Sequence, residues 1–101
     1  NDEQLQVIFI LQESLSNIRK HAQAHHVVVE LDNRHDFTLR IRDDGVGFDT
    51  GRLKNMSEAH VGLGIMQERA RRINAVLSVE SQPHQGTTVT LVLPQHRRTA
   101  S

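Results

Sequence analysis

The chain has 101 residues with 12 basic and 12 acidic side chains, so its formal net charge is zero and no global field favours nucleic acid or an anionic membrane. This length corresponds to one domain with a modest core, and no apolar run approaches the roughly 20 residues of a membrane span. Cysteine, Trp and Tyr are absent, which excludes a disulfide scaffold and argues against the aromatic platforms of single-strand nucleic-acid binders.

An amphipathic helix is the first predicted element, over residues 5–22. Asp2 and Glu3 give it an acidic first turn, which suits the positive end of a helix dipole. Its apolar residues recur at the spacing of one helix face: Leu5, Ile8, Phe9, Leu11, Leu15, Ile18 and Ala22.

Two strands are predicted next, over residues 27–31 and 37–42, because apolar side chains alternate with others in both. The link over residues 32–36 carries turn chemistry, so we expect an antiparallel hairpin. Residues 43–62 are the least regular stretch. We expect a short helical piece over residues 52–58 and a functional role for this loop, such as a lid.

A second helix is predicted from Leu63, where Met66, Ala70 and Ile73 share its apolar face. Strands around residues 77–79 and over 88–93 follow, joined by a turn at 83–86. Because every strand alternates, one face of the sheet should be covered. We therefore predict a two-layer α+β sandwich, with a mixed, mostly antiparallel sheet covered on one face by helices, over residues 1–94. Residues 95–101 lack apolar anchors and should form a disordered tail.

A polar stripe runs along the first helix and contains Glu13, Asn17, Lys20 and His21. Asparagine has no helical advantage in mid-helix, and its amide oxygen suits Mg²⁺. Lys20 and His21 would then face phosphates bound beside the metal. The alternative is a solvated helix face with no ligand.

Asp43 ends a strand and opens the pattern Asp43-x-Gly45-x-Gly47. A carboxylate at a strand end can accept a hydrogen bond from an exocyclic amine such as adenine N6, which the O6 of guanine cannot donate. The two glycines let the backbone pass close to a ring. An ordinary Asp-Gly turn is the alternative, and Asp44 is the alternative carboxylate, although the spacing favours Asp43.

Gly62-Leu63-Gly64 directly precedes the second predicted helix, where free amides and the helix dipole can bind phosphates. Helix starts also carry glycine without a ligand. Thr87 begins the last strand, and its hydroxyl could support Asp43 or a bridging water. Thr is equally a good strand former.

Other chemistries find little support in the sequence. Of the seven histidines, His21 and His25 stand four residues apart, but His25 lies beyond the predicted end of the first helix and no cysteine assists, so a helical zinc site is not indicated. No serine lies in a Gly-x-Ser-x-Gly elbow, and the Walker phosphate loop is absent.

These clusters together resemble the Bergerat (GHKL-type) ATP-binding fold of gyrase, chaperones, histidine kinases and mismatch-repair proteins. Within it, the chain resembles the catalytic domain of sensor histidine kinases of the nitrate/nitrite-sensor subfamily. The stretches that carry the resemblance span nearly the whole chain, at residues 12–22, 43–48, 62–70 and 86–94.

The resemblance implies that Asn17 coordinates Mg²⁺ and that Asp43 hydrogen-bonds the adenine of ATP. Residues 48–61 would form a short lid over the nucleotide. In gyrase-like relatives, the glutamate at the position of Glu13 is a general base for hydrolysis, whereas in histidine kinases the acceptor is a histidine on another domain. The remaining residues expected to border the nucleotide are Lys20, His21, Gly45, Gly47, Gly62, Leu63, Gly64 and Thr87.

The chain departs from the kinase pattern in three respects. Asn74 stands near the usual double glycine after the second helix, where it can take the left-handed conformation. The usual Pro-Gly-x-Gly turn reads Pro83-His84-Gln85-Gly86 and loses one glycine. A phosphoacceptor hairpin and the strand expected before the first helix are missing, so we expect an excised domain that cannot autophosphorylate alone.

The sequence therefore predicts a cytoplasmic catalytic domain that binds Mg-ATP, in a parent chain anchored in the inner membrane. It would present the γ-phosphate to a histidine on a separate dimerisation domain, for relay to a LuxR-type response regulator. The alternatives are a catalytically silent nucleotide-binding module, another GHKL-type ATPase or kinase, and an adaptor whose glycines are only turns.

Overall fold

The computed structural model describes residues 2–47 and 58–94, with only the backbone described for 58–61. Helix α1 (Asp2–Asn17) continues into a π-helical turn, η1 (Ile18–Ala22). Strands β1 (Val27–Asp32) and β2 (Phe37–Asp43) form the predicted hairpin. Helix α2 (Glu58–Arg72), β3 (Val76–Ser81) and β4 (Thr87–Leu93) complete the fold. The helical piece predicted over 52–58 lies, except for Glu58, outside the described residues.

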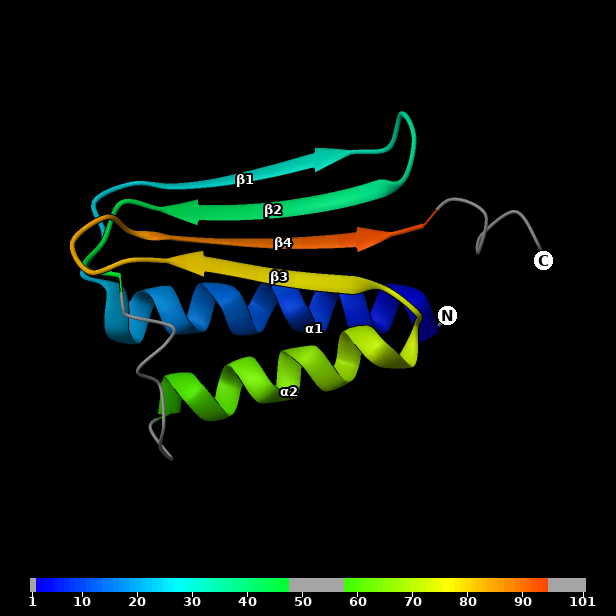
Figure 1. The fold of residues 1–101 in the computed structure, drawn as a ribbon, viewed down its shortest axis with the longest axis horizontal. Helices are drawn as coiled ribbons and strands as arrows, with labels where there is room; N and C mark the ends of the chain where they lie inside the picture. The colour runs from blue at the N-terminus through cyan, green and yellow to red at the C-terminus, as the bar shows by residue number, and fades with distance from the viewer. Residues whose placement is uncertain (1, 48–57, 95–101) are drawn as a thin grey trace.

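The strands form one sheet in the order β1-β2-β4-β3, and the two helices cover one of its faces (Figure 1). The two-layer α+β sandwich is therefore confirmed. The expectation of a mixed sheet is wrong for the described strands, since all three pairings among them are antiparallel. The register places Thr87 opposite both Asp43 and Ser81, so the three residues share one row across three strands.

The core lies between the sheet and the helices. Alternate residues of β2 and β4 are buried, as period-two patterning predicts. The largest side chains with almost no exposed surface are Ile10, Leu39, Ile41, Met66 and Leu91. Ser14 is also buried; its hydroxyl donates to Ile10 O at 2.8 Å and lies 3.4 Å from Met66 Sδ. This contact helps to hold α1 against α2 close to Glu13 and Asn17.

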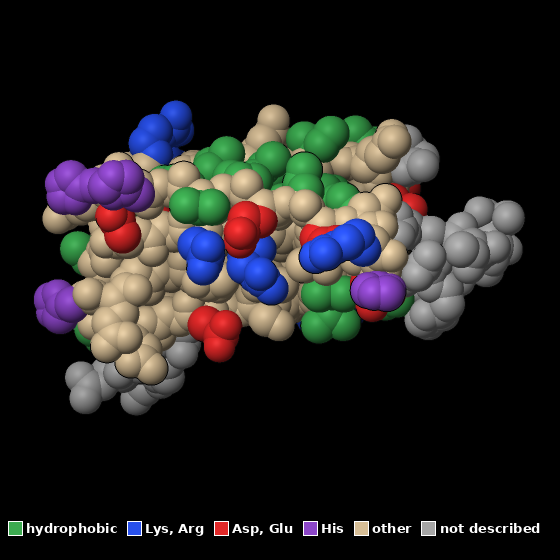
Figure 2. Space-filling model, turned by 90° about the horizontal axis from the view of Figure 1, so that it is seen from above, with side chains coloured by type: hydrophobic (Ala, Val, Ile, Leu, Met, Phe, Trp, Pro, Cys, Tyr) green, Lys and Arg blue, Asp and Glu red, His purple; other side chains and the backbone are tan. Residues whose placement is uncertain are grey.

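Strand β1 departs from the expected burial. Val27, Val29 and Leu31 face the helix side of the sheet, yet Val29 is 44% and Leu31 is 67% exposed. Leu5 of α1 is 66% exposed, and such hydrophobic side chains gather along one side of the face in Figure 2. Among the described strands β1 has a neighbour on one side only, so alternation alone did not ensure burial.

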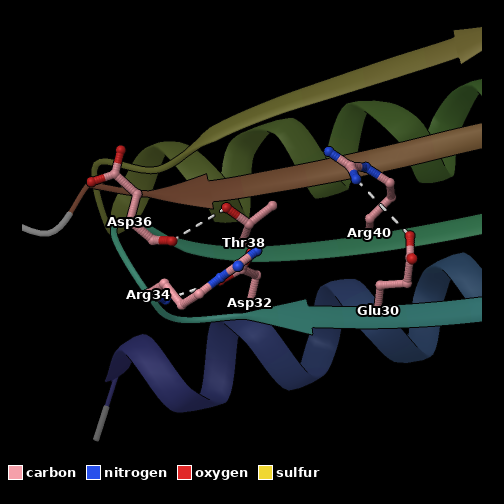
Figure 3. Close-up of polar contacts among 6 residues, drawn as sticks. All are labelled: Glu30, Asp32, Arg34, Asp36, Thr38 and Arg40. Atoms are coloured by element: carbon pink, nitrogen blue, oxygen red, sulfur yellow. Dashed lines mark hydrogen bonds and ion pairs between the residues drawn. The ribbon is translucent and has the colours of Figure 1, made fainter.

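The outer face of the sheet is polar. Glu30 lies 3.9 Å from Arg40 and 3.5 Å from Arg42, and Figure 2 shows charged side chains in a band across this view. At the β1–β2 loop, Arg34 pairs with Asp32 at 2.8 Å (Figure 3). Exposed pairs of this kind are screened by solvent, so they contribute little to the stability of the fold.

Helix α2 ends in a Schellman motif, as the sequence allowed. Asn74 takes the left-handed conformation with φ of 59°, which confirms the prediction made for it. The Ala75 amide donates to Ala70 O at 2.9 Å, and the Asn74 amide donates to Arg71 O at 3.1 Å. These bonds satisfy the last carbonyls of the helix.

The predicted start of α2 is wrong. The helix begins at Glu58, so Gly62, Leu63 and Gly64 lie inside it instead of before it. Two glycines cost about 1 kcal/mol each in a helix interior, which is too little to prevent helix formation when the other residues favour it. The free amides at the start of this helix therefore do not belong to Gly62 or Gly64.

The β3–β4 turn contains a strained residue that can be tested. His84 has φ of 67°, whereas glycine is the residue suited to that region. We expect His84→Gly to raise the free energy of unfolding by about 0.5–1 kcal/mol, because relief of the left-handed strain exceeds the added flexibility of the unfolded chain. Chemical denaturation measures this. Gln85→Gly, at a position without positive φ, should give no gain, and an equal gain would contradict the explanation.

Candidate functional site

The chemistry-bearing residues gather at one end of the sandwich. The C-terminal end of α1, the ends of β2 and β3 and the start of β4 all lie there, together with the described start of α2 (Figure 1). Segments 12–22, 43–47, 62–64 and 81–87, although far apart in the sequence, thus contribute to the same end.

Gly62 brings the first group together. It is buried, and a methyl group in place of its hydrogen would lie 2.7 Å from Glu13 Oε2 and 3.2 Å from Asn17 Nδ2. A larger side chain on α2 would therefore displace the polar side chains of α1. The result is a carboxylate and an amide, both half-buried, held side by side against the backbone of α2.

Lys20 and His21 lie on η1, with exposed side chains. The predicted stripe assumed a continuous α-helix from Glu13 to His21. The π-helical turn widens the helix after Asn17, so Lys20 and His21 do not follow Asn17 at α-helical spacing. They stay at the same end of the molecule as Asn17.

The turn over residues 43–47 is held from two sides. On one side, the Val46 amide donates to Ala22 O at 2.7 Å, and a methyl group on Gly45 would overlap that same carbonyl. On the other, Gly47 has φ of 62° and leaves no room for a methyl group beside Gln82 O. Both glycines are thus required by close backbone contacts. The turn is fastened to the helix that carries Asn17.

Asp43 is half-buried at the end of β2. Its Oδ1 accepts a hydrogen bond from the Gly45 amide at 2.8 Å. Within residues 2–47 and 58–94, no donor is recorded for its Oδ2. One carboxylate oxygen therefore fixes the side chain, and the other is left for a ligand.

Asp44, the alternative carboxylate, is engaged elsewhere. Its Oδ1 accepts from the amides of His25 and His26 at 2.8 and 2.9 Å, and its Oδ2 lies 2.9 Å from His26 Nδ1. These hydrogen bonds, above all those from His26, hold the pKa of Asp44 well below its ordinary value. Asp44 ties the start of β1 to the end of β2, which leaves Asp43 as the carboxylate available to a ligand.

Acid should weaken the hydrogen bonds by which Asp44 links the start of β1 to the end of β2. Because the folded-state pKa of Asp44 is lowered, its contribution to stability is complete above the ordinary value of 3.8 and is lost as the pH falls below it. Asp32, whose bonds to Arg34 lower its pKa to about 2, adds to the same trend. We expect Asp44→Asn, which keeps an oxygen for the His25 and His26 amides, to flatten the fall of unfolding free energy below pH 4. Denaturation at several pH values measures this, and parallel curves for the variant and wild type would contradict it.

Thr87 and Ser81 lie beside Asp43 in one row of the sheet. Their hydroxyl oxygens are 2.7 Å apart, and the Ser81 hydroxyl donates to Gly86 O at 3.0 Å. Sequence reasoning identified Thr87 and missed Ser81. Pairing across the predicted turn at 83–86 would have indicated it, because Ser81 stands at the far side of that turn.

Two other predicted residues lie less close to this group. The side chain of Leu63 packs against the hydrophobic core, so it does not face a ligand at this end of the sandwich. Gly64 is exposed, and a methyl group there would meet no atom within 4 Å. The structure therefore gives no packing reason for glycine at position 64.

The fold and these contacts define an α+β sandwich that collects a carboxylate–amide pair, a strand-end carboxylate and a glycine turn at one end. Residues 2–97 match the family described as histidine kinase-, DNA gyrase B- and HSP90-like ATPase, and the chain belongs to this family. The predicted GHKL-type histidine kinase ATP-binding domain is thereby confirmed at the level of the family. None of the helices in the described residues is long and apolar enough to span a bilayer.

Curated relatives carry kinase and sensor names. The chain is 38% identical over 86 residues to the signal transduction histidine-protein kinase/phosphatase DegS of Brevibacillus brevis, covering 84% of this chain and 22% of the relative. It is also 38% identical over 89 residues to the sensor protein VraS of Staphylococcus haemolyticus, covering 87% and 25%. The chain thus spans a quarter or less of these relatives. Neither name is that of a nitrate or nitrite sensor.

Solved structures agree on the fold. The histidine kinase domain of the blue-light activated kinase EL346 from Erythrobacter litoralis superposes with a TM-score of 0.70 at 19% identity, covering 94% of this chain and 48% of that one. The ATP binding domain of PrrB from Mycobacterium tuberculosis gives 0.68 at 22%, covering 89% and 67%. At these identities the likeness supports the fold alone.

Proposed function

We propose that this domain binds Mg-ATP and is the catalytic domain of a two-component sensor histidine kinase. It would donate the γ-phosphate to a histidine on a separate dimerisation domain of the same kinase. A response regulator of LuxR type would then receive the phosphoryl group, and the domain would work in the cytoplasm in a parent anchored in the inner membrane. The nitrate/nitrite-sensor subfamily is proposed from the residues at 12–22 and 62–70.

One observation carries this proposal. The helix that holds Glu13 and Asn17 against Gly62 also anchors, through Ala22, the turn that begins at Asp43. One continuous helical segment therefore links the amide-and-carboxylate pair to the carboxylate that we propose reads the base. A ligand with a base at one end and phosphates at the other matches this arrangement.

The donor set fits a magnesium ion. Mg²⁺ prefers oxygen ligands and takes one or two from the protein beside substrate phosphates. The side chain of Asn17 presents an amide oxygen, the Glu13 carboxylate lies against the same glycine, and Gly62 keeps that space free of a side chain. Asn17 would hold the ion, which when bound neutralises phosphate charge.

The other residues would bind and orient the nucleotide. Asp43 would accept a hydrogen bond from the amine of adenine, while Gly45 and Gly47 let the backbone pass close to the ring. Lys20 and His21 would attract the phosphates, and the α2 backbone over residues 62–64 would border them. Glu13 lies beside Asn17, where a carboxylate can take the proton that an attacking group releases. Catalysis would rest on positioning and charge, as in other phosphoryl transfers.

Calorimetric titration of the 101-residue chain with ATP, with and without Mg²⁺, tests the proposal. We expect saturable binding that Mg²⁺ strengthens, and we expect Asn17→Ala to weaken binding in Mg²⁺ roughly 10-fold or more, since a direct ligand is lost. Gln12→Ala is the matched control, because it removes an exposed amide from the same helix.

Three outcomes distinguish the alternatives. No saturable binding would leave only the adaptor. If Mg²⁺ strengthens binding to Asn17→Ala as much as to wild type, the proposed metal ligand is wrong. A parent kinase that binds ATP through this domain and transfers no phosphate to histidine would support the silent module instead.

A further inference from the structure

Within the row Asp43–Thr87–Ser81, it is possible to say which hydroxyl group donates its hydrogen and which oxygen accepts it. All three residues point to the helix side of the sheet, because each is two positions from an inward-facing residue of its strand. Thr87 stands between the other two, with Asp43 opposite it on β2 and Ser81 opposite it on β3. The row lies at the end of the sheet where the proposed nucleotide would bind.

The direction follows from counting hydrogens. A serine hydroxyl has one hydrogen, and a backbone carbonyl can only accept. Ser81 Oγ lies 3.0 Å from Gly86 O, so its hydrogen is donated there. The 2.7 Å contact between Ser81 and Thr87 must then be made with the hydrogen of Thr87. Thr87 has no second hydrogen, and towards a ligand it can only accept.

Asp43 adds a second acceptor beside it. Its Oδ1 is held by the Gly45 amide, and an ionised carboxylate donates nothing. The row thus offers a ligand two neighbouring acceptors and no donor from these side chains.

We propose that Ser81 is a positioning residue that sets base specificity: by taking the hydrogen of Thr87, it makes the Asp43–Thr87 edge complementary to an amino group with two N–H donors. This inference rests on the proposed function and extends it to a residue outside the nucleotide motifs. The 6-amino group of adenine meets the requirement. A 6-carbonyl purine, which presents an acceptor there, would face Thr87 oxygen to oxygen.

Ser81→Ala frees the hydrogen of Thr87, which can then turn towards a carbonyl. The test compares the Kd of ATP with that of inosine triphosphate, which differs at this edge of the base. We expect the ratio of the Kd for inosine triphosphate to the Kd for ATP to fall about 2- to 10-fold in Ser81→Ala, the range of one neutral hydrogen bond. Ser81→Thr keeps the hydroxyl and should retain the wild-type ratio.

Ser78→Ala is the matched control, since Ser78 lies on the same strand with an exposed side chain on the opposite face. In a Thr87→Val background, Ser81→Ala should change the ratio no further, because Ser81 acts through Thr87. An unchanged ratio in Ser81→Ala, an equal change in Ser78→Ala, or an equal change in the Thr87→Val background would overturn the inference while ATP binding stands. If the wild-type chain binds no ATP, the proposed function itself fails, and the inference with it.

Discussion

Asp43→Asn is expected to weaken ATP binding by the 101-residue chain roughly 10- to 100-fold, the range of one hydrogen bond to a charged group. The reason lies in the geometry of the turn. The Gly45 amide needs an acceptor, so the oxygen of the new side chain would take the place of Oδ1 at 2.8 Å. The NH₂ group would then occupy the position of Oδ2 and meet the adenine amine donor to donor.

This substitution preserves the turn but replaces the free acceptor oxygen of residue 43 with a donor. It is therefore a more specific test of adenine recognition than substitution by alanine. Calorimetry with ATP measures the loss, and denaturation should give a stability near that of wild type. Asp36→Asn is the matched control, because Asp36 precedes the other end of the same strand (Figure 3). Equal affinities for wild type and Asp43→Asn would remove adenine recognition from this carboxylate.

The elements were predictable where local patterning and tertiary packing agree. The alternation in β2 and β4 is realised as burial, and Asn74 adopts the left-handed conformation that a helix C-terminus requires. The prediction failed at the start of α2. There, glycine was interpreted as a boundary, although helix propensity is a weak prior that neighbouring residues override.

The burial of β1 failed for a different reason. Alternation in Val27, Val29 and Leu31 identifies the face that they share, and it contains no information on what covers that face. Strand order decides that, and it depends on long-range pairing. The pairing of Ser81 with Thr87 follows from the local β3–β4 turn, whereas its place in one row with Asp43 depends on the long-range pairing of β4 with β2.

The glycines illustrate the limit most clearly. From the sequence, Gly45 and Gly47 are interpreted as turn residues and Gly62 and Gly64 as the start of a helix, without a distinction between those that can be replaced and those that cannot. In the structure, Gly45 and Gly86 lie against backbone carbonyls, whereas Gly64 faces open space. The requirement for glycine therefore comes from contacts between distant segments, and only the fold distinguishes the glycines that cannot be replaced.

This distinction predicts opposite effects for the same substitution. Gly86→Ala should lower the free energy of unfolding by roughly 2–4 kcal/mol, because residue 86 has φ of 79° and a methyl group would overlap Asp43 O. Gly45→Ala, which would overlap Ala22 O, should cost a similar amount. Gly64→Ala should instead raise it by up to about 1 kcal/mol, since alanine favours helix and meets no neighbour.

Chemical denaturation of the three variants measures these differences, with Gly64→Ala as the internal control for the Gly-to-Ala change. A domain of this size is stable by about 5–15 kcal/mol, so the loss at Gly86 would be a large part of the total. Because Gly86 lies against the backbone of Asp43, a displaced turn would also move the carboxylate that is proposed to read adenine. Stability equal to wild type in both Gly45→Ala and Gly86→Ala would mean that the Asp43 turn is not held between η1 and the β3–β4 turn. The convergence of the site at this end of the sheet would then lose its structural basis.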